Sequence, residues 1–136
     1  TLLTEDVRYV MPVRSTRYGR TTDEFSTRSF VFNDDLHGLK MRVARLHTRF
    51  AWAEDPPSRN RHFVSNVVVE DEQDGVLRVR SNVLLYRSRL ADAEGEIFTG
   101  ERRDEIRRTP DGLRLARRTV YMDQTVLGLS AVTTFI

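Results

Sequence analysis

Hydrophobic residues recur with two different periods along this chain, and the period changes near residue 60. Before that point, apolar residues follow one another at steps of three and four, at Leu36, Leu39, Val43, Leu46 and Phe50. This spacing places them on one side of an amphipathic helix. Asn33 or Asp34 can cap its start. Pro56 and Pro57 end the helical region, because proline lacks the amide hydrogen that a helix needs.

From residue 60 onward the period is two, which is typical of β-strands. The strand candidates are residues 60–71, 75–90, 96–108 and 113–125. The short connections "QDG", "ADAEG" and "TPDG" contain glycine together with an acidic residue, which is a strong signal for hairpins. Residues 7–16 also alternate and predict a strand, whereas residues 16–32 have no clear period and predict a long loop.

The apolar alternation changes phase within two of these strand candidates. In residues 75–90, Leu84 and Tyr86 interrupt the alternation, and in residues 113–125 the apolar face changes between Leu115 and Ala116. A curved sheet that contains a bulge exposes different faces at its two ends, and Gly100 inside a strand candidate fits such a bend. We therefore predict an α+β fold in which a bent antiparallel sheet wraps around helices. The length suits a single domain over residues 1–136.

Composition and charge exclude several classes of protein. The chain is 39% hydrophobic and 31% charged, as expected for a globular domain, and no apolar run approaches the ~20 residues that span a bilayer. The net charge is only +2, and acidic residues are interleaved with arginines as in "GERRDEIRR", so no basic face is available for nucleic acid. Cysteine is absent, which excludes disulfides and thiolate metal sites and is compatible with a cytoplasmic protein.

Candidate catalytic chemistry is sparse. The three histidines His37, His47 and His62 lack the spacing of a helical metal site, and there is no nucleophile elbow or glycine-rich phosphate loop. Glu54 and His62 flank the Pro-Pro pair, where they would act as acid and base. Asp104 would be a general base if it faced a cavity inside the bent sheet. The alternative for Asp104 is an ordinary ion pair with arginines of neighbouring strands.

Several segments carry a resemblance to a known family. "LLTEDVRYVMPVR", "WAEDPPSRNRHFVSNVVV", "NVLLYRSRL", "EIFTGERRDEIRR" and "LARRTVYMDQTVL" occur in this order. Together they resemble the small, or β, subunit of bacterial aromatic-ring-hydroxylating dioxygenases of the biphenyl, benzene and naphthalene type. The resemblance extends from residue 2 to about residue 127. It implies the cone-shaped α+β fold of scytalone dehydratase and ketosteroid isomerase. It also implies an N-terminal helical segment that is missing before "LLTEDVRY" here.

The resemblance further implies an assembly. Subunits of this family form a β homotrimer beneath three α subunits in an α3β3 hexamer, and the α subunit carries a Rieske [2Fe-2S] cluster and a mononuclear iron. A Rieske cluster needs two cysteine and two histidine ligands, so this cysteine-free chain cannot hold one. We therefore expect a non-catalytic subunit with no cofactor, metal or catalytic residue of its own. It would support the iron-bearing α subunits in aromatic compound catabolism.

The stretch "WAEDPPSRNRHFVSN" is expected to have an architectural role in that assembly. Its Pro-Pro pair fixes the backbone, its tryptophan offers a large apolar anchor, and its arginines can form bidentate pairs with carboxylates of a neighbouring subunit. Arginine is abundant elsewhere too, since Lys40 is the only lysine. The candidate interface residues are Trp52, Pro57, Arg59, Arg61, Arg87, Arg102 and Arg103.

Two alternative hypotheses use the same fold without the assembly. A stand-alone dehydratase or isomerase would bring His62, Asp104 and Tyr86 into one closed cavity. That hypothesis fails if the three side chains point to different faces of the sheet. A small-molecule-binding protein is the other alternative, which the sequence does not separate from the enzyme.

Overall fold

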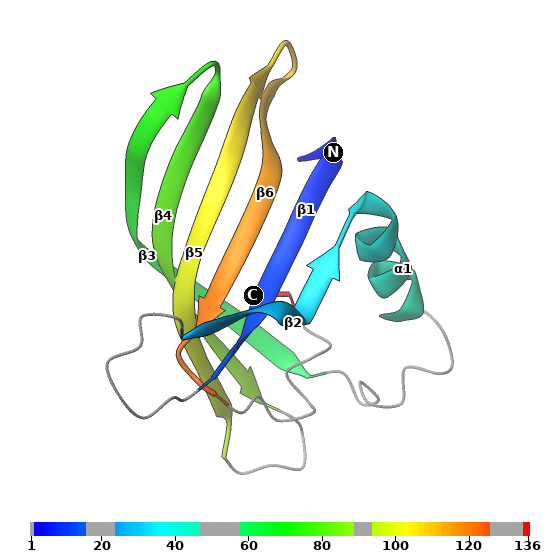
Figure 1. Cartoon of the computed structure of the whole chain (residues 1–136). Coiled ribbons are helices and arrows are strands. Elements are labelled where there is room, and N and C mark those ends of the chain that lie inside the picture. Colours follow the sequence, from blue (N-terminus) through cyan, green and yellow to red (C-terminus); the bar gives the residue numbers. More distant parts are fainter. Residues whose placement is uncertain (1, 16–23, 47–57, 89–93, 126–134) are drawn as a thin grey trace.

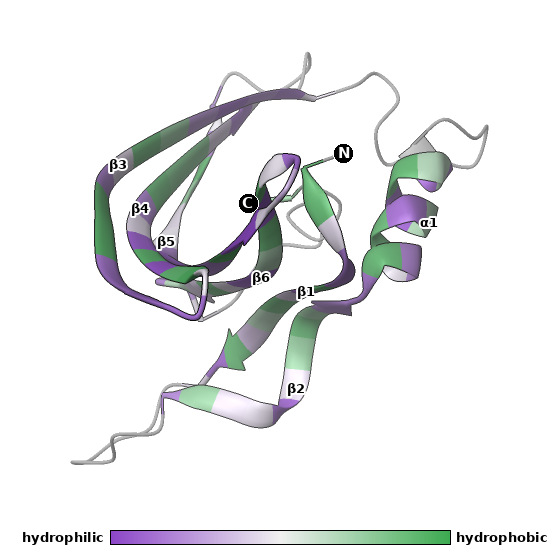
Figure 2. Ribbon diagram, turned by 90° about the horizontal axis from the view of Figure 1, so that it is seen from above, coloured by the Kyte–Doolittle hydropathy of each residue, from purple (hydrophilic) through white to green (hydrophobic). Residues whose placement is uncertain are grey.

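The computed structural model describes residues 2–15, 24–46, 58–88, 94–125 and 135–136. One curved sheet contains the described strands, in the order β2-β1-β6-β5-β4-β3 (Figure 1). Seen from above, the sheet curls round on itself, and α1 and β3 lie at opposite edges (Figure 2). The elements are β1 (Leu3–Arg14), β2 (Phe25–Asp34), α1 (Leu36–Leu46), β3 (Arg59–Gln73), β4 (Val76–Ser88), β5 (Glu96–Thr109) and β6 (Gly112–Met122).

The predicted meander of long strands is confirmed for β3 to β6, each of which pairs antiparallel with the next. The β3–β4 turn has Asp74 and Gly75 at φ 53° and 74°. Positive φ at both central residues is what a tight hairpin with right-handed twist requires. The sheet is nevertheless mixed, because β1 pairs parallel with β6. The prediction of a purely antiparallel sheet was therefore wrong at this one pair, which joins segments from opposite ends of the chain.

The prediction of a long loop over residues 16–32 was also wrong, because β2 begins at Phe25. Its pairing with β1 is irregular on both sides of Pro12, where the register shifts. Such shifts break the period-two pattern by which a strand is recognised in sequence. The helix prediction is confirmed over Leu36–Leu46, but the cap is Asp35, whose Oδ1 accepts a hydrogen bond from the Gly38 backbone N–H at 2.8 Å. Phe50 lies outside the described residues.

The bulges that bend the sheet lie in β3 and β6. In β3, an extra residue separates Ser65 from Val68, and Asn66 there has a positive φ of 54°. In β6, Ala116 is the extra residue, since Leu115 and Arg117 pair with neighbouring residues of β5. This bulge accounts for the apolar phase change in residues 113–125. The bulge suggested for residues 75–90 is not in β4, which pairs with β5 without a shift.

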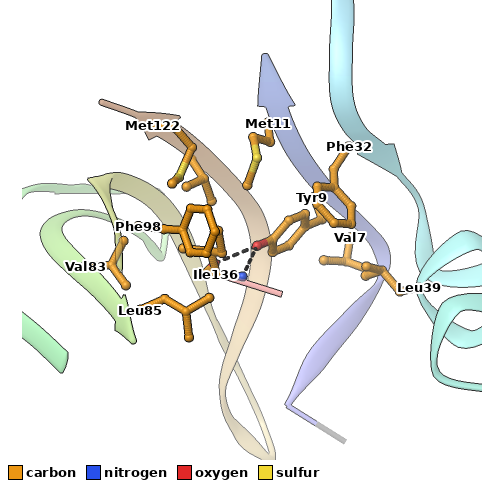
Figure 3. Packing of buried hydrophobic residues seen from close by; sticks show 11 residues of the cluster. Val7, Tyr9, Met11, Phe32, Leu39, Val83, Leu85, Phe98, Met122 and Ile136 are labelled. Carbon is orange, nitrogen blue, oxygen red and sulfur yellow. Dashed lines mark hydrogen bonds between the residues drawn. The ribbon is translucent and has the colours of Figure 1, made fainter. Parts of the chain in front are cut away.

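The core fills the inner face of the curved sheet, where α1 and the C-terminal residues cover it (Figure 3). Tyr9 stands at its centre. Its hydroxyl donates to the Ile136 carbonyl at 2.6 Å and accepts from the Ile136 backbone N–H at 2.9 Å. Its ring meets the edge of Phe32 at 5.5 Å between centroids. The buried cluster comprises Val7, Tyr9, Met11, Phe32, Leu39, Val83, Leu85, Phe98, Val120, Met122 and Ile136.

Gly100 lies at a close approach between β5 and β6. A Cβ atom at this position would lie 2.5 Å from the Tyr121 carbonyl oxygen, which is backbone and cannot turn aside. We expect Gly100→Ala to lower the free energy of unfolding by about 1–3 kcal/mol, because the two strands must separate locally. Chemical denaturation measures this change. Ile97→Val on the same strand is the control, because Ile97 is exposed and its replacement should cost less than about 0.5 kcal/mol. Equal costs for both variants would contradict the close-packing explanation.

Candidate functional site

Strand β3 carries an apolar surface at the free edge of the sheet. It is the last strand in the sheet order, and every one of its residues is exposed. Exposed apolar patches of this kind mark interaction sites. The two bulges disturb its outer backbone edge, so a partner is expected to pack on its side chains rather than extend the sheet. The apolar residues lie on both faces of the strand and are Phe63, Val64, Val67, Val68 and Val69, which are between 43% and 63% exposed.

The two ends of β3 differ in how their charges are compensated. At the C-terminal end, Glu70, Asp71 and Glu72 pair with arginines of β4 and β5 at 2.7, 2.9 and 2.6 Å. At the N-terminal end, Arg59 and Arg61 are exposed and pair with none of the described carboxylates. An exposed guanidinium can form a bidentate pair with a carboxylate of another chain.

Arg103 lies on the outer face of β5, next to the aromatic ring of Tyr121. Its Nε donates to Glu101 Oε1 at 2.7 Å, and its guanidinium lies over the ring of Tyr121 at 5.2 Å. Tyr121 in turn meets Phe25 edge to face at 4.7 Å. Arginine and tyrosine are enriched among the residues that dominate interface energetics, so this region is a second surface to which a partner can bind.

Arg87 and Arg102, both predicted interface residues, lie inside the subunit. Arg87 is 1% exposed, and its Nε donates to Ser58 Oγ at 3.0 Å. Arg102 is 8% exposed and lies on the inner face of β5. Successive side chains of a strand point to opposite faces, and sequence alternation alone does not state which face is covered. Both side chains are buried within this chain, and their place in an interface stays a prediction.

Asp104, Arg118 and Arg102 form a charged cluster on the inner face. Arg118 makes a bidentate pair with Asp104, from Nε at 2.9 Å and from Nη2 at 2.7 Å. Burial lowers the pKa of Arg118, but hydrogen bonding and attraction to Asp104 outweigh it, so its pKa is raised. Arg102 has no such pair: burial lowers its pKa, and the positive charge of Arg118 lowers it further. The cluster therefore holds two cations for one carboxylate.

Ion pairs within the chain account for much of its arginine content. Arg107 of β5 binds Asp6 of β1 through two hydrogen bonds of 3.0 Å each. The hydrogen bond from Arg107 is the main reason that the pKa of Asp6 falls to about 2. This pair reaches across β6, which lies between the two strands. Ion pairs of arginine thus connect strands of one subunit, in addition to any contact between subunits.

The residues of the alternative enzyme hypothesis do not come together. Tyr86 pairs with Ile97 on the outer face of the sheet, whereas Asp104 faces inward and is bound to Arg118. His62 is exposed on β3, where its Nε2 is 2.8 Å from the Phe135 carbonyl oxygen. His62 pairs with the inner-face residue Leu85, so Tyr86 alone lies on the outer face. The three side chains therefore do not share one cavity, as that hypothesis requires.

Other candidates are placed only in part. Trp52, Glu54, Pro57 and His47 lie outside the described residues. Among the described residues no group of histidine and acidic side chains has the geometry of a metal site. In the same part of the chain, no helix combines the length and hydrophobicity needed to cross a membrane.

Sequence reasoning did not identify Arg118, the partner of Asp104. Counting back from the β5–β6 hairpin, where Thr109 pairs with Gly112, would place Arg117 opposite Asp104. The bulge at Ala116 shifts this pairing by one residue, so Arg118 stands there instead. The apolar phase change at Leu115 was the available signal for this shift.

Known proteins share this fold. A chain of naphthalene 1,2-dioxygenase with indole bound superposes with a TM-score of 0.81 at 24% identity, and the match covers 98% of this chain and 71% of that one. A putative scytalone dehydratase from Novosphingobium aromaticivorans superposes with a TM-score of 0.61 at 16% identity, covering 90% of this chain and 67% of that one. The chain is therefore a cone-shaped α+β protein, as the resemblance implied.

Sequence comparison narrows this class to one family. The family described as ring hydroxylating beta subunit matches residues 1–128. The β subunit of biphenyl 2,3-dioxygenase from Rhodococcus jostii is 40% identical over 132 residues, which are 93% of this chain and 70% of that protein. The β subunit of benzene 1,2-dioxygenase from Pseudomonas putida is 39% identical over the same shares. The chain belongs to the β-subunit family of aromatic-ring-hydroxylating dioxygenases, which favours a subunit over a stand-alone enzyme.

Proposed function

We propose that this chain is a non-catalytic, cytoplasmic subunit of a terminal oxygenase, in which it supports an iron-bearing α subunit during aromatic catabolism. Family membership carries this proposal. The chemistry of the interior supports it, because the buried carboxylate Asp104 is held by Arg118 and does not face a general-acid partner. The absence of cysteine means that a Rieske cluster has to belong to the partner chain.

We further propose a β homotrimer within an α3β3 hexamer, formed by one domain that spans residues 1–136. The parallel pairing of β1 with β6 supports a single domain, because it joins the two ends of the chain in one sheet. The exposed apolar edge of β3, with Arg59 and Arg61 at its start, supports a contact between subunits. Arg103 belongs to a separate exposed surface beside Tyr121, which suits a second contact.

The mass of the particle and its iron content test this function together. We expect the chain alone to form a trimer without bound iron. Co-expressed with an α subunit, it should form a hexamer whose iron depends on α. Light scattering gives the mass, and elemental analysis gives the iron. A chain that remains a monomer and does not bind α would overturn the proposal. Iron retained by the chain alone would do the same.

A further inference from the structure

An apolar cavity of about 490 Å³ lies between α1 and the inner face of β1 and β6. This volume falls in the range of about 300–1,000 Å³ that is usual for small-molecule sites. Its walls are mostly aliphatic, and the rings of Tyr9 and Phe135, which meet edge to face at 5.7 Å, add an aromatic surface. The principal apolar residues are Leu3, Leu36, Leu39, Val43 and Leu115.

The polar atoms of this wall are mainly cationic. Lys40 and Arg118 line the cavity, and no carboxylate of the described residues does so. Asp104, the counter-ion of Arg118, lies on the inner face. Both of its carboxylate oxygens accept hydrogen bonds from Arg118. A ligand in the cavity therefore meets apolar surface together with positive charge.

Arg102 adds a second cation close to Arg118, although it does not line the cavity itself. It is 8% exposed, and its Nε has no hydrogen-bond partner among the described residues. A buried guanidinium nitrogen without a partner is costly, because its N–H loses hydration without gaining a hydrogen bond. Its lowered pKa, caused by burial and then by Arg118, has the same origin. An anion that enters the cavity would reduce this cost.

We propose that this cavity binds a hydrophobic monocarboxylate, with the carboxylate toward Arg118 and Lys40 and the apolar body against the aliphatic and aromatic wall. Arg118 can still donate to a ligand, because a guanidinium has five N–H groups and Asp104 uses two of them. Arg102 attracts the ligand carboxylate at longer range, because the cluster has two positive charges and Asp104 balances only one of them. The cavity and the proposed contact on β3 come close at Phe135, which lines the cavity and whose carbonyl oxygen lies 2.8 Å from His62 Nε2.

A matched pair of probes tests whether charge is recognised. 2-Naphthoate and 2-naphthamide have nearly the same shape, but only the acid is charged. We expect the purified protein to bind the acid at least about tenfold more tightly than the amide, which is the size expected for a charge-assisted hydrogen bond. Isothermal titration calorimetry gives both affinities. Equal affinities, or no binding of either probe, would overturn the proposal.

Variants then locate the site. Arg102→Gln should lower the affinity for 2-naphthoate by about three- to tenfold and leave the affinity for 2-naphthamide unchanged. Binding of the amide then also shows that the fold is intact. Arg103→Gln is the matched control, since it removes the next arginine of β5 on the outer face and should change neither affinity. Leu39→Trp should abolish binding of both probes by filling the cavity. If Arg102→Gln leaves acid binding unchanged, or if Leu39→Trp still binds either probe at full affinity, the ligand is elsewhere and the proposal fails.

Discussion

Replacing Asp104 by alanine should lower the free energy of unfolding by about 3 kcal/mol, which is the low end of the cost of breaking a buried ion pair. Asp104 is buried, and its removal leaves two adjacent guanidinium groups, Arg118 and Arg102, without a carboxylate partner among the described residues. Arg118 keeps some access to water, since its side chain is 23% exposed, and this limits the loss. Urea denaturation followed by circular dichroism measures the change.

Asp71→Ala is the matched control for this prediction. Asp71 also pairs with an arginine, Arg78, at 2.9 Å, but both side chains are 51% exposed. Exposed pairs of this type contribute about 0–1 kcal/mol, because water screens both charges. A loss for Asp104→Ala no greater than that for Asp71→Ala would show that the inner cluster is hydrated and that its charges are not coupled as the structure indicates.

The second large effect is expected on self-association, after substitutions in the edge strand β3. Phe63→Glu combined with Val67→Glu should convert the proposed β trimer to monomers, weakening self-association by at least about thirtyfold. Both residues are exposed in the subunit, at 54% and 63%, so the changes should leave the fold intact. In a packed interface, by contrast, two carboxylates would lose their hydration without gaining partners. Sedimentation velocity over a range of concentrations measures the association.

Leu113→Glu provides the control for the edge strand. Leu113 is an apolar residue of β6 that is 50% exposed, and it lies outside β3. Its replacement should leave the oligomer unchanged. If Leu113→Glu dissociates the particle and the β3 variant does not, the subunits contact one another through a different surface. If neither variant has an effect, the apolar edge of β3 has some other use.

The inner cluster and the edge strand illustrate two uses of arginine in this chain. Arg59 and Arg61 are exposed and have no described carboxylate partner, as expected for residues that contact another subunit. Arg118 instead places positive charge against an apolar cavity inside the subunit, and Arg102 is buried close to it. Arginine therefore takes part in both the proposed subunit contact and the proposed ligand site. The variants described above alter one of these sites at a time.

The sequence alone determined the features that depend on near neighbours. The meander from β3 to β6 follows from period-two alternation and from hairpin turns such as Asp74-Gly75, because such turns fix the register of the strands they join. The helix α1 and its apolar stripe follow from local spacing in the same way, although its cap is Asp35 and not the predicted Asn33 or Asp34. The resemblance carried by short segments such as "NVLLYRSRL" already indicated the family that the comparisons show.

Only the tertiary structure decided which side chains are inside. The parallel pairing of β1 with β6, the strand β2 and the inward position of Arg87 and Arg102 depend on contacts between segments that are distant in the chain. A single bulged residue, Ala116, determines that Asp104 meets Arg118 and not Arg117. Local patterns specify alternation along a strand, but which face is buried depends on what the fold packs against it.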